Sequence, residues 1–67
     1  GDSDTVNINT ADAAALTTLT GIGEAKAQAI LSYREEHGAF STVEEIMQVP
    51  GIKESTFSAI KDKIAVK

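Results

Sequence analysis

The sequence predicts an all-α domain of four short helices, arranged as two similar units about an internal pseudo-two-fold axis. Three observations lead to this class. Apolar residues recur at helical spacing, and no run alternates in the way that a half-buried strand would. Residues that start and stop helices bound these runs. Finally, "LTGIGEAKAQAI" (19–30) is repeated in outline by "VPGIKESTFSAI" (49–60).

Composition limits the chain to one small domain. It has 67 residues and no cysteine, which excludes disulfides and thiolate metal sites. It contains neither an apolar run of membrane-spanning length nor a signal peptide. We interpret "GDSDT" (1–5) as a linker or tag remnant cut from a longer chain, and residues 6–67 as the domain. The formal charge of −4 means that any nucleic-acid binding must depend on how the cations cluster.

The first helix is expected over residues 11–18. Asn9 or Thr10 can serve as its N-cap, because both side chains accept hydrogen bonds from the first N–H groups of a helix. Leu16 and Leu19 then share one apolar face with Ala15.

The second helix is expected over residues 24–37. Gly38 is a natural stop, and His37 in the last turn suits the negative end of the helix dipole. We therefore assign His37 no catalytic role. A single buried stripe is predicted to comprise Ile22, Ala25, Ala29, Ile30 and Tyr33.

The third helix is expected over residues 42–48. Ser41 followed by Glu44 has the spacing of a capping box, in which each residue satisfies an N–H group of the other. Pro50 and Gly51 end the helix.

The fourth helix is expected over residues 54–64, because apolar residues recur there at i, i+3 and i+7. "VNI" (6–8) is too short to stand as a strand alone, and its two apolar side chains are expected to pack onto the bundle. The three aromatic residues are interpreted as core rather than as a stacking platform: Tyr33, Phe40 and Phe57.

The internal repeat consists of a helix, a tight hairpin and a helix, used twice. Neither unit can bury its apolar face alone, so the two units must pack on each other. The hairpins are expected near residues 19–24 and 49–54. The paired positions are Leu19 and Val49, Gly21 and Gly51, Ile22 and Ile52, Glu24 and Glu54, Ala29 and Ala59, and Ile30 and Ile60.

The first hairpin, "GIG", has the features of an anion site. Gly21 and Gly23 allow left-handed backbone and close approach of another molecule, while Ile22 can point inward as an anchor. Unpaired N–H groups and the positive dipole end lie at the start of the helix that follows. Lys26 lies one turn into that helix, within reach of the same anion. One such site suits a phosphate, and two related by a two-fold axis suit the two strands of a duplex.

These residues resemble the tandem helix-hairpin-helix domain of ComEA-type competence proteins. The similarity rests on "NINTA", "GIG.AKA..I", "YRE..G.F" and a second "GI", and it extends over residues 6–64. It implies a four-helix double-hairpin fold that binds double-stranded DNA through its backbone without reading sequence. It also implies a cell-surface or periplasmic receptor for DNA in natural transformation, which passes DNA to an inner-membrane channel or to other competence proteins.

The resemblance also implies which residues bind DNA. In the first half these are Gly21, Gly23, Ala25 and Lys26, and in the second half Gly51, Lys53, Ser55 and Thr56.

The second hairpin departs from the pattern, because Lys53 replaces the second glycine and Thr56 stands where the first repeat has Lys26. A left-handed backbone at Lys53 would cost ~1 kcal/mol. The first hairpin departs as well, because Thr20 stands where a proline is usual.

Two other functions remain open from the sequence. The acidic balance favours a protein-docking module that has lost DNA binding, and the same hairpins would also suit an accessory DNA-binding domain of a larger repair protein. We predict no enzyme, because the sequence offers no nucleophile–base pair. We likewise expect no metal ligands, no cofactor and no small-molecule substrate. If DNA is the ligand, Lys26 and Lys53 should lie on one face, with the acidic side chains turned elsewhere.

Overall fold

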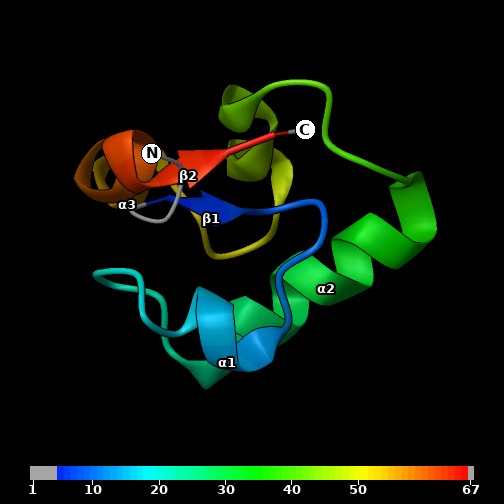
Figure 1. Cartoon of the computed structure of the whole chain (residues 1–67), viewed down its shortest axis with the longest axis horizontal. Coiled ribbons are helices and arrows are strands. Elements are labelled where there is room, and N and C mark those ends of the chain that lie inside the picture. The colour runs from blue at the N-terminus through cyan, green and yellow to red at the C-terminus, as the bar shows by residue number, and fades with distance from the viewer. Residues whose placement is uncertain (1–4, 67) are drawn as a thin grey trace.

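Helices carry the fold of residues 5–66, the part of the chain that the computed structural model describes. The predicted all-α class is confirmed, and a minute two-stranded sheet is added to it. In Figure 1, α1 lies beside the amino-terminal half of α2, the longest ribbon. The interpretation of residues 1–5 as a linker concerns residues that, except for Thr5, lie outside the described part. The elements are β1 (Val6–Asn7), α1 (Ala13–Leu16), α2 (Glu24–His37), the 3-10 helix η2 (Val43–Gln48), α3 (Glu54–Ile60), the 3-10 helix η3 (Lys61–Lys63) and β2 (Ile64–Ala65).

Helix α2 begins and ends where the sequence predicts. Gly38 ends it with a φ of 87° and donates its N–H to the Arg34 carbonyl at 2.9 Å. The predicted buried stripe is confirmed for Ile22 and Ile30, and Ala29 and Tyr33 pack against the core, but the stripe was wrong at Ala25, which is exposed, and it missed the buried Ala27. Ala27 lies three residues before Ile30 and shares its face of the helix, whereas Ala25 lies five residues before it and faces solvent.

Helix α1 is shorter than the predicted 11–18, and its N-cap is neither Asn9 nor Thr10. Asp12 caps it, and one carboxylate oxygen accepts from the Ala15 N–H at 2.9 Å. The hydroxyl groups of Thr17 and Thr18 then bond to carbonyls of the preceding turn. These side-chain bonds compete with continued helix.

The side chain of Asn9 does not cap α1 but forms two hydrogen bonds with the backbone of the distant Phe40. Its amide nitrogen donates to the Phe40 carbonyl at 3.0 Å, and its amide oxygen accepts from the Phe40 N–H at 2.7 Å. Nearby, Arg34 donates to the Ile8 carbonyl at 2.7 Å. Together these bonds fasten the amino-terminal segment to α2 and to the loop after it.

The third helical segment is a 3-10 helix, η2, where an α-helix over 42–48 was predicted. The expected capping box is also wrong in its partner, because Glu45 rather than Glu44 reaches back to accept from the Ser41 N–H. The N-cap residue is Thr42, which makes no side-chain capping bond. Because the segment is capped at Thr42, one residue later than expected, Glu45 rather than Glu44 occupies its third position.

The fourth helix ends at Ile60, before the predicted Ile64. After η3 the chain becomes extended, and β2 pairs in parallel with β1, with Val6 opposite Ile64 (Figure 1). The expectation that residues 6–8 form no strand was therefore wrong. Each strand is too short alone but finds its partner in the other terminal segment, and the Ile8 N–H adds a bond to the Ala65 carbonyl at 3.0 Å.

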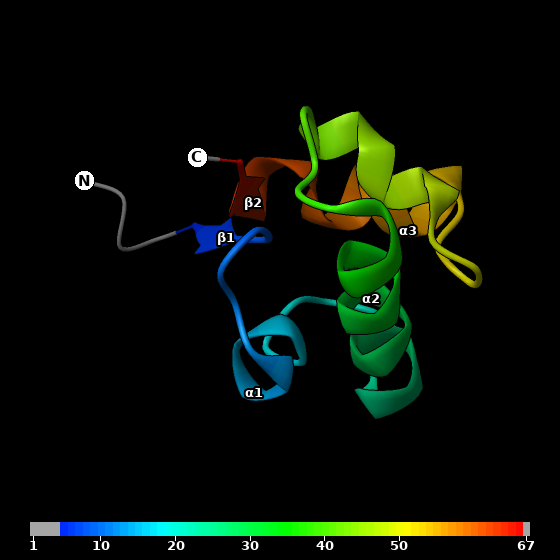
Figure 2. The same ribbon diagram turned by 90° about the vertical axis from the view of Figure 1, so that its right-hand side faces the viewer.

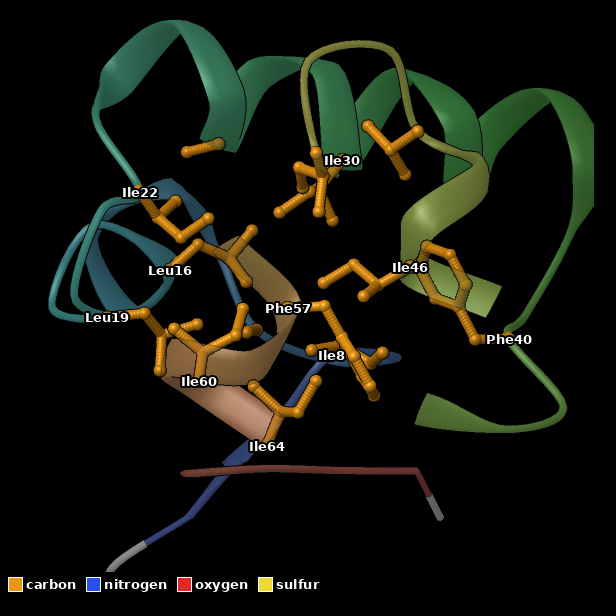
Figure 3. Close-up of a cluster of buried hydrophobic side chains, with 14 residues drawn as sticks. Ile8, Leu16, Leu19, Ile22, Ile30, Phe40, Ile46, Phe57, Ile60 and Ile64 are labelled. Carbon is orange, nitrogen blue, oxygen red and sulfur yellow. The ribbon is translucent and has the colours of Figure 1, made fainter. Parts of the chain in front are cut away.

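The core draws on α1, α2, η2 and α3 (Figure 3). Phe40 and Phe57 are buried as predicted, while Tyr33 packs at the edge of the core with its ring stacked on Phe40. In residues 5–66 no helix combines the length and the apolarity needed to cross a membrane. The largest fully buried side chains are Ile8, Leu16, Ile30, Ile46, Val49, Ile52 and Ile60.

Candidate nucleic-acid interface

The two hairpins have nearly the same backbone conformation. Gly21 and Gly51 are left-handed, with φ of 81° and 91°. Two residues later, Gly23 and Lys53 are both extended N-cap residues, with φ of −87° and −111°. The dipeptide "GI", which occurs in both hairpins, accounts for the shared conformation. In both hairpins the helix then begins directly after an extended N-cap residue.

The hairpins are also closed by matching hydrogen bonds. The Ile22 N–H donates to the Leu19 carbonyl at 3.1 Å, and the Ile52 N–H donates to the Val49 carbonyl at the same distance. Ile22 and Ile52 are 3% and 1% exposed, so both side chains point into the core as the sequence predicts. The inward anchors turn the rest of each hairpin toward solvent.

Backbone N–H donors face outward at the start of both helices. The first helical bond of α2 joins the Ala27 N–H to the Gly23 carbonyl, and that of α3 joins Phe57 to Lys53, each at 2.9 Å. The N–H groups before these bonds have no acceptor within their own helix. Neither N-cap residue makes a side-chain capping bond. These donors are therefore available to an external anion, and α2, the longer helix, adds the stronger dipole.

Glycine is required for backbone conformation at Gly21 and Gly51 but not at Gly23. The expectation that Gly23 has φ > 0 was wrong, and Lys53 bears no left-handed strain because its φ is also negative. A Cβ added at Gly23 would meet nothing within 4 Å. The space beside this backbone is open to a ligand.

The hairpins lie against each other's helices. A Cβ placed on Gly51 would be 3.9 Å from Cγ of Lys26, and one placed on Gly21 would be 3.9 Å from Cγ2 of Thr56. Lys26 and Thr56 occupy equivalent positions of the repeat, so the contacts are reciprocal. The loop before α3 accordingly runs beside α2 (Figure 2).

The structure thus brings the predicted site residues together around two adjacent hairpins. The stem of Lys26 reaches the second hairpin, only two residues from Lys53, so the two lysines belong to one region. Lys26 and Thr56 are half-buried. The exposed members of the predicted set are Gly21, Gly23, Ala25, Gly51, Lys53 and Ser55.

Two acidic side chains are turned away from this region, but Glu36 is not, because it lines a hollow together with Pro50 beside the second hairpin. Glu24 lines a surface hollow with Ala13, Ala14 and Thr17 of the first helical segment. Glu45 is bound to the Ser41 backbone. Within residues 5–66 no cluster of three or more His, Asp or Glu side chains could hold a metal ion.

One cation near the first hairpin was missed by sequence reasoning. Lys63 lines a hollow together with Thr18, Leu19 and Thr20. No local signal in the sequence could have placed it there, because its position depends on the carboxy-terminal segment returning to pair with β1.

Comparison with known proteins gives a family match over nearly the whole chain. The model described as "Helix-hairpin-helix motif" matches residues 1–65. The chain is 52% identical over 62 residues to ComE operon protein 1 of Bacillus subtilis (strain 168), which covers 92% of this chain and 30% of that protein. This similarity confirms the resemblance to ComEA-type proteins.

Two further relatives show the same motif in other contexts. An uncharacterized protein of Haemophilus influenzae is 48% identical over 63 residues, which are 92% of this chain and 56% of that protein. Endonuclease/exonuclease/phosphatase family domain-containing protein 1 of Homo sapiens is 37% identical over 59 residues, which are 88% of this chain and 10% of that protein. The chain therefore spans only part of each of these relatives.

Proposed function

Because the chain belongs to the helix-hairpin-helix family, we propose that it binds double-stranded DNA through backbone phosphates without reading the base sequence. The observation that carries this proposal is the pair of adjacent hairpins with equivalent backbone, each presenting free N–H donors to solvent. Phosphate contacts of this kind position a protein but carry no base information.

The proposed interface has two halves related by a pseudo-two-fold axis, one for each DNA strand. The matching hairpin bonds and the reciprocal contacts of Lys26 with Gly51 and of Thr56 with Gly21 support this arrangement. In the first half, the backbone of Gly21, Gly23 and Ala25 approaches a phosphate. In the second half, Lys53 and Ser55 beside Gly51 supply the contacts. The side chains of Lys26 and Thr56 cross between the halves, because Lys26 of the first repeat lies against Gly51 and Thr56 of the second lies against Gly21.

The proposed biological role is that of a DNA receptor in natural transformation, held at the cell surface or in the periplasm. The 52% identity to ComE operon protein 1 supports this role. An inner-membrane DNA channel or other competence proteins would then receive the DNA. The role is binding rather than catalysis.

Two alternatives have specific support. The net charge of −4 favours a docking module that has lost DNA binding. The similarity to a segment of a human protein named for an endonuclease/exonuclease/phosphatase domain favours an accessory domain of a larger protein. Titration with duplex DNA separates the docking function from the other two, because only a docking module fails to bind DNA.

We expect binding to be sequence-tolerant and salt-sensitive. With about two to four phosphates neutralised, log K should fall against log salt with a slope of roughly −2 to −4. The measurement is fluorescence anisotropy with several unrelated labelled duplexes at a series of salt concentrations. A strong preference for one duplex over its scrambled sequence, or binding that ignores salt, would contradict the proposed contacts.

The variant Gly23→Val should weaken binding while leaving the fold intact. Gly23 has a negative φ, and a Cβ there has no atom of the surrounding protein within 4 Å, so we expect valine to be accommodated and to extend into the volume a phosphate would occupy. The matched control is Gly38→Val, which has a left-handed backbone away from the hairpins and should lower the melting temperature without a direct effect on binding. Unchanged DNA affinity for folded Gly23→Val would show that no ligand approaches there.

A further inference from the structure

The cations of residues 5–66 are unevenly available for binding. Arg34 is held by its bond to the Ile8 carbonyl. Of the lysines, Lys26 and Lys53 lie at the second hairpin, which leaves Lys61 and Lys63 of η3. Both are exposed, but only Lys63 lines a hollow beside the first hairpin.

The hollow at Lys63 adjoins the proposed DNA interface. It has a volume of about 240 Å³, and its lining includes Thr20, the exposed neighbour of Gly21. The next residue holds Lys63 in this place, because Ile64 is buried in the core and pairs with Val6 of β1. The backbone of Lys63 is thus fixed, while its ammonium group remains free to move in solvent.

The corresponding flank of the second hairpin has the opposite charge. Pro50 is the equivalent of Thr20, and it lines a hollow of about 350 Å³ on the outer side of α2. The charged side chain of that lining is Glu36, accompanied by His37 and Tyr33. One end of the hairpin pair therefore carries an ammonium group and the other a carboxylate.

We infer that Lys63 is a further phosphate contact, which extends the DNA-binding surface beyond the first hairpin, while Glu36 limits that surface at the second. The inference rests on the proposed function. Its physical basis is that an exposed lysine beside a phosphate-contacting loop attracts the next phosphate of the same strand, and a carboxylate in the equivalent place repels it. The acidic domain thus gains local positive charge where DNA lies.

The test compares neighbouring residues of like charge. Lys63→Ala should weaken duplex binding by about two- to fivefold and lower the magnitude of the salt slope by about one, whereas Lys61→Ala should leave both unchanged. Glu36→Gln should strengthen binding by a similar factor, whereas Glu35→Gln should not. Affinities come from fluorescence anisotropy with a labelled duplex, and circular dichroism confirms that each variant is folded.

The outcomes distinguish this inference from the proposed function. If the wild-type domain binds duplex and Lys63→Ala binds equally well, the inference is wrong and the hairpin interface stands. If Lys61→Ala weakens binding as much as Lys63→Ala, the effect is one of net charge, and the assignment to this flank is overturned. If the wild-type domain does not bind duplex, the proposed function itself fails and this inference falls with it.

Discussion

Ile52→Ala is expected to unfold a large part of the domain population. The side chain is 1% exposed and anchors the second hairpin in the core, so its truncation removes buried surface and leaves a cavity. Such changes cost about 2–5 kcal/mol. A domain of this size has roughly 3–10 kcal/mol of stability in total. Urea denaturation followed by circular dichroism measures the loss.

A smaller truncation at the same position tests whether the loss of stability follows the amount of buried side chain that is removed. Ile52→Val removes one methylene group and should cost only about 0.5–1.5 kcal/mol. Ile22→Ala should resemble Ile52→Ala, because Ile22 anchors the first hairpin at 3% exposure. A midpoint for Ile52→Ala equal to that of the wild-type domain would mean that the hairpin anchor contributes nothing to the fold.

The features that sequence reasoning predicts well are those decided locally. Helix α2 was predicted with correct ends because Gly38 is an unambiguous stop and because the second "G" of "GIG" is the N-cap. Ile22 was identified as an inward anchor because it is the apolar residue between two glycines, and Ile52 is its equivalent in the repeat. These properties depend on residues within one turn of each other.

The features that it missed depend on partners far along the chain. From the sequence, Asn9 is a reasonable N-cap, but its side chain bonds to the Phe40 backbone. No local sequence pattern predicts this contact. The parallel pairing of β1 with β2 joins the two ends of the domain, and two residues are too few to show an alternating pattern. The placement of Lys63 depends on that same pairing.

At the glycines of the first hairpin, the predicted room for a ligand agrees with the structure, whereas the predicted left-handed backbone is wrong at Gly23. The "GIG" of the first hairpin suggested the same freedom for Gly21 and Gly23, yet only Gly21 needs a left-handed backbone. The second unit contains the information that separates them, because a lysine replaces the second glycine there. A position that accepts Lys53 with an extended backbone does not require glycine for conformation, so the consequence of glycine at position 23 is the open space that it leaves beside the backbone.

The packing of Lys26 determines how the decisive charge experiment must be designed. Its Cγ lies against Gly51, so truncation to alanine removes packing as well as charge. Methionine keeps a flexible apolar stem of similar length and removes only the ammonium group. Lys53 is exposed, so either substitution is acceptable there.

The double variant Lys26→Met with Lys53→Met is therefore expected to lose nearly all DNA binding while keeping its fold. The stem of Lys26 lies against the second hairpin, which itself carries Lys53, and without these two lysines that half of the interface has backbone donors but no positive charge. Each substitution alone should weaken binding to all duplexes alike and reduce the magnitude of the salt slope by about one. The charge-preserving control, Lys26→Arg with Lys53→Arg, should retain most of the binding, because arginine also binds phosphate. Anisotropy titrations at low salt, with circular dichroism on the same samples, decide the matter. A folded double methionine variant with wild-type affinity would remove these lysines from the interface and favour the docking function.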